Sequence, residues 1–217
     1  MMLEFISRRN RVLLDRGLVI KKYPSEGIAA FEERTLNKLY VFGLKVPKVI
    51  SSGSMEIQME YIEGQTLLEK LELMEKENAG LELQHTLSEM LADWFLKYYQ
   101  AVDFNHTSIL RGDVNCRNFI VNDLGIWGVD FEEEVTGERE KDIGRLIAYI
   151  FTYEPSFTIW KFEFCHLLEA VMCQKLSLNR IKLHKYQYIE YEEMSKRRLG
   201  FKVPEDLDKL IALSLED

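Results

Sequence analysis

Three polar side chains stand at spacings that suit phosphoryl transfer. Asp113 and Asn118 lie five positions apart in residues 111–118, RGDVNCRN, and Asp130 follows twelve positions after Asn118. Carboxylate and amide oxygens are hard ligands of the kind that Mg²⁺ accepts alongside phosphates and water. We therefore expect Asn118 and Asp130 to hold Mg²⁺, which leaves Asp113 to accept a proton from the hydroxyl group of an acceptor.

A predicted β-hairpin brings the two metal ligands together. The apolar runs 119–121 and 126–129 flank residues 122–125, NDLG, which form a turn sequence. Because a hairpin folds the chain back, it returns Asp130 to the neighbourhood of Asn118. Asp and Asn are also common turn residues, so each one alone is weak evidence. The combination of GDxxxxN, a hairpin and VDF is far more specific.

The segment before this loop predicts a small antiparallel sheet covered by one helix. Short apolar runs indicate the strands, and residues 15–17, DRG, indicate a hairpin turn. Ser25 is a predicted N-cap, and apolar residues follow it at helical spacing until Gly43. The strands are expected at residues 3–6, 12–14, 18–23, 48–51 and 56–62.

After Gly64 the apolar pattern becomes mainly helical, with the hairpin embedded in it. The sequence therefore predicts an α+β protein in which residues 1–63 and 64–217 form two lobes of one domain. Ligand sites favour such a junction between lobes. Helices are expected around residues 67–74, 83–98, 143–151, 160–175 and 204–215.

Residues 112–118, GDVNCRN, resemble the catalytic loop of the protein-kinase-like phosphotransferases. That loop reads HRDxxxxN in protein kinases and HGDxxxxN in aminoglycoside and choline kinases. Residues 129–132, VDFE, look like the magnesium-binding DFG or DFE segment, and residues 58–64, QMEYIEG, are similar to the hinge. The matches follow the family's order along residues 1–150. The resemblance implies a two-lobed protein-kinase-like fold that uses ATP and Mg²⁺.

The resemblance also implies an ion pair that positions the ATP phosphates. Residues 18–23, LVIKKY, are similar to the strand that carries the ATP lysine. Because side chains alternate along a strand, either Lys21 or Lys22 points inward, and we favour Lys21. Glu32 falls where the family's helix supplies the glutamate that pairs with this lysine. Its place on the apolar stripe of the helix favours it over Glu33.

Four further positions acquire roles from the same resemblance. Met59 is expected beside the adenine, and the backbone of Glu60 and Ile62 is expected to hydrogen-bond with it. Asp142 resembles the family's structural aspartate, which braces the catalytic loop. A plain helix N-cap is an equally good interpretation of Asp142.

Two departures from the family pattern bear on the nucleotide and the acceptor. Residues 5–10, FISRRN, contain no glycine where the family has a Gly-rich phosphate loop, and only eleven residues separate Asp130 from Asp142. That is too few for the peptide-binding activation segment of ordinary protein kinases. The acceptor is then a protein, as for minimal atypical Ser/Thr kinases such as that of the tRNA-threonylcarbamoylation complex, or a small molecule, as for aminoglycoside, choline and lipopolysaccharide-sugar kinases. The acidic run 132–134 would suit a cationic acceptor, although such runs are commonly solvated faces.

A catalytically inactive nucleotide-binding pseudokinase scaffold is the alternative function. The missing glycine loop favours it. The retention of Asp113, Asn118 and Asp130 argues against it, because a scaffold needs none of these side chains.

The composition argues against some classes of binding partner. A net charge of −8 argues against a protein that coats nucleic acid or an anionic membrane. No apolar run reaches the roughly 20 residues that cross a bilayer. The first ten residues, MMLEFISRRN, carry charges and no signal-peptide cleavage site. We therefore expect a cytoplasmic protein. The expectation of a hydroxyl-bearing acceptor comes from the role of Asp113 given above.

Overall fold

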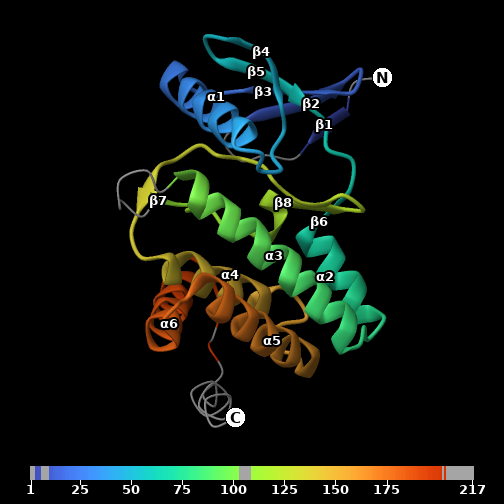
Figure 1. Cartoon of the computed structure of the whole chain (residues 1–217), viewed down its shortest axis with the longest axis vertical. Helices are drawn as coiled ribbons and strands as arrows, with labels where there is room; N and C mark the ends of the chain where they lie inside the picture. The colour runs from blue at the N-terminus through green and yellow to red at the C-terminus, as the bar shows by residue number, and fades with distance from the viewer. Residues whose placement is uncertain (1–2, 6–9, 103–108, 202, 204–217) are drawn as a thin grey trace.

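The computed structural model describes residues 3–5, 10–102, 109–201 and 203. Within these residues, a five-stranded sheet with one α-helix forms the N-terminal lobe, and five α-helices with short strands form the C-terminal lobe (Figure 1). The predicted α+β class and its two-lobed arrangement are confirmed. The stretch at residues 6–9, within the segment without glycine, and the helix expected at residues 204–215 lie outside the described residues.

The N-terminal sheet consists of β1 (Leu3–Phe5), β2 (Arg11–Asp15), β3 (Leu18–Lys22), β4 (Val49–Gly53) and β5 (Glu56–Glu60). Every neighbouring pair is antiparallel, in the order β1-β2-β3-β5-β4, so β3 occupies the centre. The β2–β3 turn at Arg16 and Gly17 has φ angles of 50° and 79°, as a tight hairpin turn requires. The sequence therefore places the strand with the two candidate lysines in the middle of the sheet.

One helix, α1 (Glu26–Val41), covers this sheet (Figure 1). It begins where the sequence predicts, because the Ser25 side chain accepts a hydrogen bond from the backbone of Ile28 at 3.4 Å. Its buried stripe consists of Ala29, Glu32, Leu36 and Leu39. A glutamate on an otherwise apolar buried stripe requires a partner, since an unpaired buried charge is strongly destabilising.

Five helices build the C-terminal lobe: α2 (Leu67–Lys76), α3 (Leu81–Val102), α4 (Arg139–Thr152), α5 (Ile159–Leu176) and α6 (Arg180–Arg197). The main helix pairs are α3 with α5 and α4 with α6. Fully buried aromatic side chains fill the space between them, among them Phe95, Tyr99 and Phe164. Among the helices of the described residues, none combines the length and apolarity needed to cross a bilayer.

Short strands around residues 111–118 complete the C-terminal lobe. The predicted hairpin forms β8 (Phe119–Asn122) and β9 (Gly125–Gly128), and β6 (Gln65–Thr66) pairs with its outer edge. A separate pair joins β7 (Ile109–Leu110) to β10 (Val135–Thr136). The sequence did not predict β6, β7 or β10, because two-residue strands carry no periodicity.

Candidate active site

Lys21 lies at the centre of a buried cluster of three carboxylates. Its Nζ is 2.7 Å from Glu32 Oε2, 2.5 Å from Asp130 Oδ1 and 2.8 Å from Glu132 Oε1. Lys21 is only 5% exposed, so these interactions act with little screening by solvent. The cluster joins β3, α1 and the segment after β9, which come from both lobes.

The two alternatives that sequence alternation left open point elsewhere. Lys22 is exposed and pairs with Glu56 of the neighbouring strand at 3.3 Å. Glu33 accepts a hydrogen bond from Ser52 Oγ at 2.7 Å. The structure therefore places Lys21 and Glu32 inside the cluster, and neither Lys22 nor Glu33.

Glu32 also fastens the segment that carries Asp130. Its Oε1 accepts a hydrogen bond from the backbone nitrogen of Phe131 at 2.9 Å, and its Oε2 accepts one from the Tyr23 hydroxyl at 2.8 Å. Every oxygen of this buried carboxylate is thus satisfied by a neighbour from another element. Movement of α1 would therefore disturb the position of Asp130.

The carboxylates around Lys21 differ in their proton affinity. Burial alone would raise the pKa of Asp130, but the Lys21 ammonium outweighs burial and holds this pKa below its usual range. Burial and the neighbouring Asp130 raise the pKa of Glu132, and Lys21 offsets this only in part. As pH falls, Glu132 therefore takes up a proton before Asp130 does.

Asp113 is exposed, while the loop around it is held by local hydrogen bonds. Its Oδ1 accepts from the backbone of Asn115 at 3.1 Å, and its carbonyl accepts from Asn118 Nδ2 at 3.3 Å. The backbone of Val129 donates to the carbonyl of Asn118 at 2.9 Å. The hairpin therefore returns Asp130 to a position directly after a residue that is bonded to Asn118.

Asp142 fixes the start of this loop. It is fully buried, and it accepts hydrogen bonds from the backbone of Arg111 at 2.7 Å, the backbone of Gly112 at 3.1 Å and the Tyr99 hydroxyl at 3.0 Å. Burial raises the pKa of Asp142 despite these three donors. The N-cap interpretation is wrong, since the cap of α4 is Glu138 and Asp142 lies inside the helix.

The candidate adenine-binding residues lie where the chain leaves the sheet. Met59 is buried in β5 and faces Val19 of β3 in the register of the strands. Glu60 ends β5, and its backbone nitrogen donates to the carbonyl of Lys48 at 2.9 Å. Ile62 is buried just beyond. Their contacts with adenine stay a prediction.

The acidic run 132–134 divides between two places, which its spacing did not reveal. Glu132 belongs to the Lys21 cluster, and the Asn10 side chain donates a hydrogen bond to it. Glu133 and Glu134 line a separate cavity of about 530 Å³ between α1 and α3, together with Phe31. Sequence analysis therefore missed Glu132, although its position two residues after Asp130 was a usable signal.

Arg111 is a second residue whose place the sequence did not predict. It stands where the family has histidine, and it is 3% exposed. Its guanidinium group lies 4.1 Å from the centre of the Phe131 ring and donates to the carbonyl of Val129. Arg111 thus connects the loop at residues 111–118 to the segment that carries Asp130.

The oxygen donors fit a magnesium ion. Asp130 has a side chain that is 40% exposed, so part of its carboxylate is available beyond Lys21. Glu32, Asp130 and Glu132 also have oxygens within 4.8 Å of one another, but Lys21 Nζ contacts one carboxylate oxygen of each. Hard oxygen donors of this kind, with phosphates and water, are those that Mg²⁺ prefers.

Solved structures of several small-molecule kinases share this fold. The aminoglycoside phosphotransferase APH(2'')-Ib with bound ADP has a TM-score of 0.66 at 13% identity and covers 100% of this chain and 92% of its own. Amicoumacin kinase hAmiN, with AMP-PNP, Ca²⁺ and Ami, has a TM-score of 0.66 at 11% identity, with coverages of 99% and 86%. The streptomycin–ATP–APH(2'')-IIa ternary complex has a TM-score of 0.65 at 11% identity, with coverages of 91% and 86%.

The sequence itself matches a family model. The model of the RIO domain matches residues 8–149, a stretch that includes Lys21, Glu32, Asp113 and Asp130. The match spans more than half of the 217 residues. It falls on the same residues that build the cluster and the loop. The chain therefore belongs to the RIO domain family, within the protein-kinase-like superfamily.

Proposed function

We propose that this protein is an ATP- and Mg²⁺-dependent phosphotransferase that moves the γ-phosphoryl group of ATP to a hydroxyl acceptor. The observation that carries the proposal is the buried Lys21–Glu32 pair, which reaches Asp130. Asp130 follows Val129, whose backbone is hydrogen-bonded to Asn118 at the end of the loop that carries the exposed Asp113. Phosphoryl transfer depends mainly on positioning and on neutralising phosphate charge. The positioned ammonium of Lys21, the proposed metal-binding carboxylate of Asp130 and the proposed base Asp113 would together meet these requirements.

Each side chain then has a distinct task. Lys21 neutralises phosphate oxygens, and Glu32 holds Lys21 in place. Asn118 and Asp130 hold Mg²⁺, which supplies charge neutralisation at the phosphates when it is bound. Asp113 accepts the proton of the acceptor hydroxyl, a task that suits its exposed position.

The nucleotide base belongs at the junction of the lobes in this proposal. Met59 would lie beside the adenine, and the backbone of Glu60 and Ile62 would hydrogen-bond with it. Residues 1–63 then act as the nucleotide-binding lobe and residues 64–217 as the catalytic lobe. We also propose a cytoplasmic location, where ATP is abundant.

Two classes of acceptor are supported by different findings. The RIO domain match supports an atypical Ser/Thr protein kinase. The structural neighbours are complexes with streptomycin or amicoumacin, which supports a small-molecule kinase. Glu133 and Glu134 line a cavity between α1 and α3 that is separate from the Lys21 cluster. They therefore do not support a cationic acceptor.

One observation favours the pseudokinase alternative. Lys21 is engaged by Glu32, Asp130 and Glu132 at once, and phosphate oxygens must displace some of these carboxylates before Lys21 can act. If they do not, the protein is a scaffold.

The test compares Asp113→Asn with Asp123→Asn, a matched control in the exposed turn of the hairpin. Purified proteins are incubated with γ-labelled ATP, Mg²⁺ and a panel of acceptors that includes proteins and amino sugars. We expect Asp113→Asn to lower transfer by about 10²-fold or more while calorimetric Mg·ATP affinity stays unchanged. Asp123→Asn should behave as the wild type. Nucleotide binding without turnover in all three proteins would establish the scaffold instead.

A further inference from the structure

A chain of charged side chains runs from α6 to the catalytic loop. Arg145 of α4 donates from Nη1 to the carbonyl of Gly112 at 2.7 Å and from Nε to Glu190 Oε2 at 2.9 Å. Arg197 donates to the other oxygen of Glu190 at 2.5 Å. Gly112 immediately precedes Asp113, so the last bond of this chain ends one residue from the proposed base.

The buried carboxylate of Glu190 holds Arg145 in one orientation. Its side chain is only 6% exposed, and that of Arg145 is 22% exposed. Burial alone would lower the pKa of Arg145, but Glu190 outweighs burial and raises it. Removing one partner from such a pair leaves the other charge uncompensated in the interior. Glu190 therefore keeps the Arg145 guanidinium aimed at the Gly112 carbonyl.

Close packing of α4 on α6 makes this contact possible. A Cβ atom on Gly144 would lie 2.6 Å from the carbonyl oxygen of Leu183 and 2.9 Å from the backbone nitrogen of Gln187. Any larger residue at position 144 would push α6 away. Gly144 thus lets α6 approach, and the next residue along α4 is Arg145.

The two peptide groups that flank Gly112 are tied by two residues of α4 that lie one turn apart. The nitrogen of Gly112 donates to Asp142 at 3.1 Å, and its carbonyl accepts from Arg145 at 2.7 Å. Gly112 has a φ of +78°, a conformation that a free chain would readily leave. With both peptide groups held, the backbone position of Asp113 is fixed.

We propose that Arg145 and Glu190 are positioning residues that hold Asp113 in its reactive place, so that α6 is a working part of the catalytic unit. This role rests on the proposed phosphotransferase function. Glu190 lies beyond residues 8–149, which match the RIO domain.

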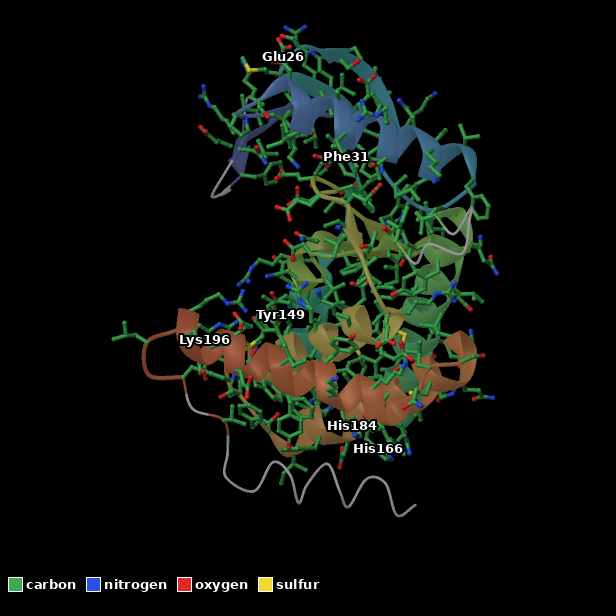
Figure 2. All side chains as sticks on the ribbon, turned by 90° about the vertical axis from the view of Figure 1, so that its left-hand side faces the viewer. Glu26, Phe31, Tyr149, His166, His184 and Lys196 are labelled. Carbon is green, nitrogen blue, oxygen red and sulfur yellow. The ribbon has the colours of Figure 1, made fainter. Side chains whose placement is uncertain are left out.

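The test uses Glu190→Gln, Arg145→Lys and a matched control, Glu169→Gln. Glu169 is also a buried carboxylate with two nitrogen partners, the His184 imidazole and the Arg180 guanidinium, each at 2.9 Å. It has no link to the catalytic loop among the described residues. His184 lies at the lower end of the molecule, away from the N-terminal lobe (Figure 2).

Two measurements are made on the full-length proteins. Hydrogen–deuterium exchange of residues 110–118 measures how readily the loop amides open to solvent, and it does not require activity. Steady-state kinetics measures kcat and the Mg·ATP affinity. We expect Glu190→Gln and Arg145→Lys to speed exchange of the loop amides and to lower kcat roughly tenfold, as a small misplacement does. The affinity for Mg·ATP should stay unchanged, and Glu169→Gln should alter only thermal stability.

The outcomes separate this proposal from the proposed function. Faster loop exchange in a protein whose wild type transfers no phosphate supports the loop contact and refutes the phosphotransferase. Unchanged exchange in both variants overturns the positioning role, whatever the activity. Equal acceleration in Glu169→Gln also overturns it, since general loosening would then explain the effect. If Glu190→Gln does not fold, Arg145→Lys decides alone, because it keeps a positive charge facing Glu190.

Discussion

Replacing Lys21 by methionine tests the cluster most directly. The change keeps the length of the side chain and removes the cation that contacts Glu32, Asp130 and Glu132. Three carboxylates would then share one buried site. We expect a large loss of stability that depends on pH.

The magnitude follows from the geometry. The remaining oxygens lie within 4.8 Å of one another, so two like charges at that separation repel by about 3.5 kcal/mol at an effective dielectric constant of about 20. Removing one partner of a buried ion pair typically costs about 3–5 kcal/mol. Because the Asp130 side chain is 40% exposed, we expect the lower end, about 3 kcal/mol, or a fall of roughly 6–12 °C in Tm.

The pH dependence has a definite sign. In the variant, repulsion raises the pKa of the carboxylates above their unfolded values, so the full destabilisation applies at high pH and is relieved as pH falls through the raised pKa values. In the wild type, Lys21 holds the pKa of Asp130 low, and the stability this gives is lost as pH falls. The difference in unfolding free energy between the two proteins should therefore shrink from pH 8 to pH 5.

Urea denaturation at pH 8 and pH 5 measures this difference. Lys22→Met is the matched control, since Lys22 is exposed on the same strand, and its effect should stay below about 0.5 kcal/mol. A Lys21→Met effect under about 1 kcal/mol, or one that is equal at both pH values, would refute the reasoning.

Two further predictions concern the metal and the catalytic loop. Asp130→Asn should abolish the Mg²⁺-dependent part of ATP binding in calorimetry, so that the variant binds ATP equally well with Mg²⁺ and with EDTA; an unchanged Mg·ATP affinity would contradict the assignment of Asp130 as a ligand. Gly112→Ala should destabilise the protein by about 1–2 kcal/mol, because φ is +78° there and a Cβ would lie 2.9 Å from Val135 Cγ2. Thermal unfolding measures this cost, and Gly27→Ala in α1, where a Cβ meets nothing within 4 Å, is the control that should show no loss.

The sequence predicted the parts of the site that depend on local structure. A hairpin of known turn type returns the chain to its start, so the proximity of Asn118 and Asp130 followed from residues 119–129. Alternation along β3 left Lys21, which we favoured, and Lys22 as alternatives, and the face of the sheet that α1 covers decides between them, since Lys21 contacts Glu32 of α1.

Contacts between distant segments could not be read from the sequence. Glu190 and Arg145 are 45 positions apart, and they meet only because Gly144 allows a close approach of two helices. Asp142 reads equally well as a cap or a brace, until the start of α4 is known to lie at Arg139. Burial of charged residues depends on tertiary packing, which periodicity does not encode.

The pairing of β10 with β7 has a consequence for compounds aimed at the proposed nucleotide site. Only residues 129–134 connect β9 to β10, and Phe131 in this connection is buried against Tyr98 and Arg111. If ATP binds as proposed, a compound that displaces the Phe131 ring would also have to break the pairing that joins residues 135–136 to 109–110. Compounds that leave Phe131 in place avoid that rearrangement.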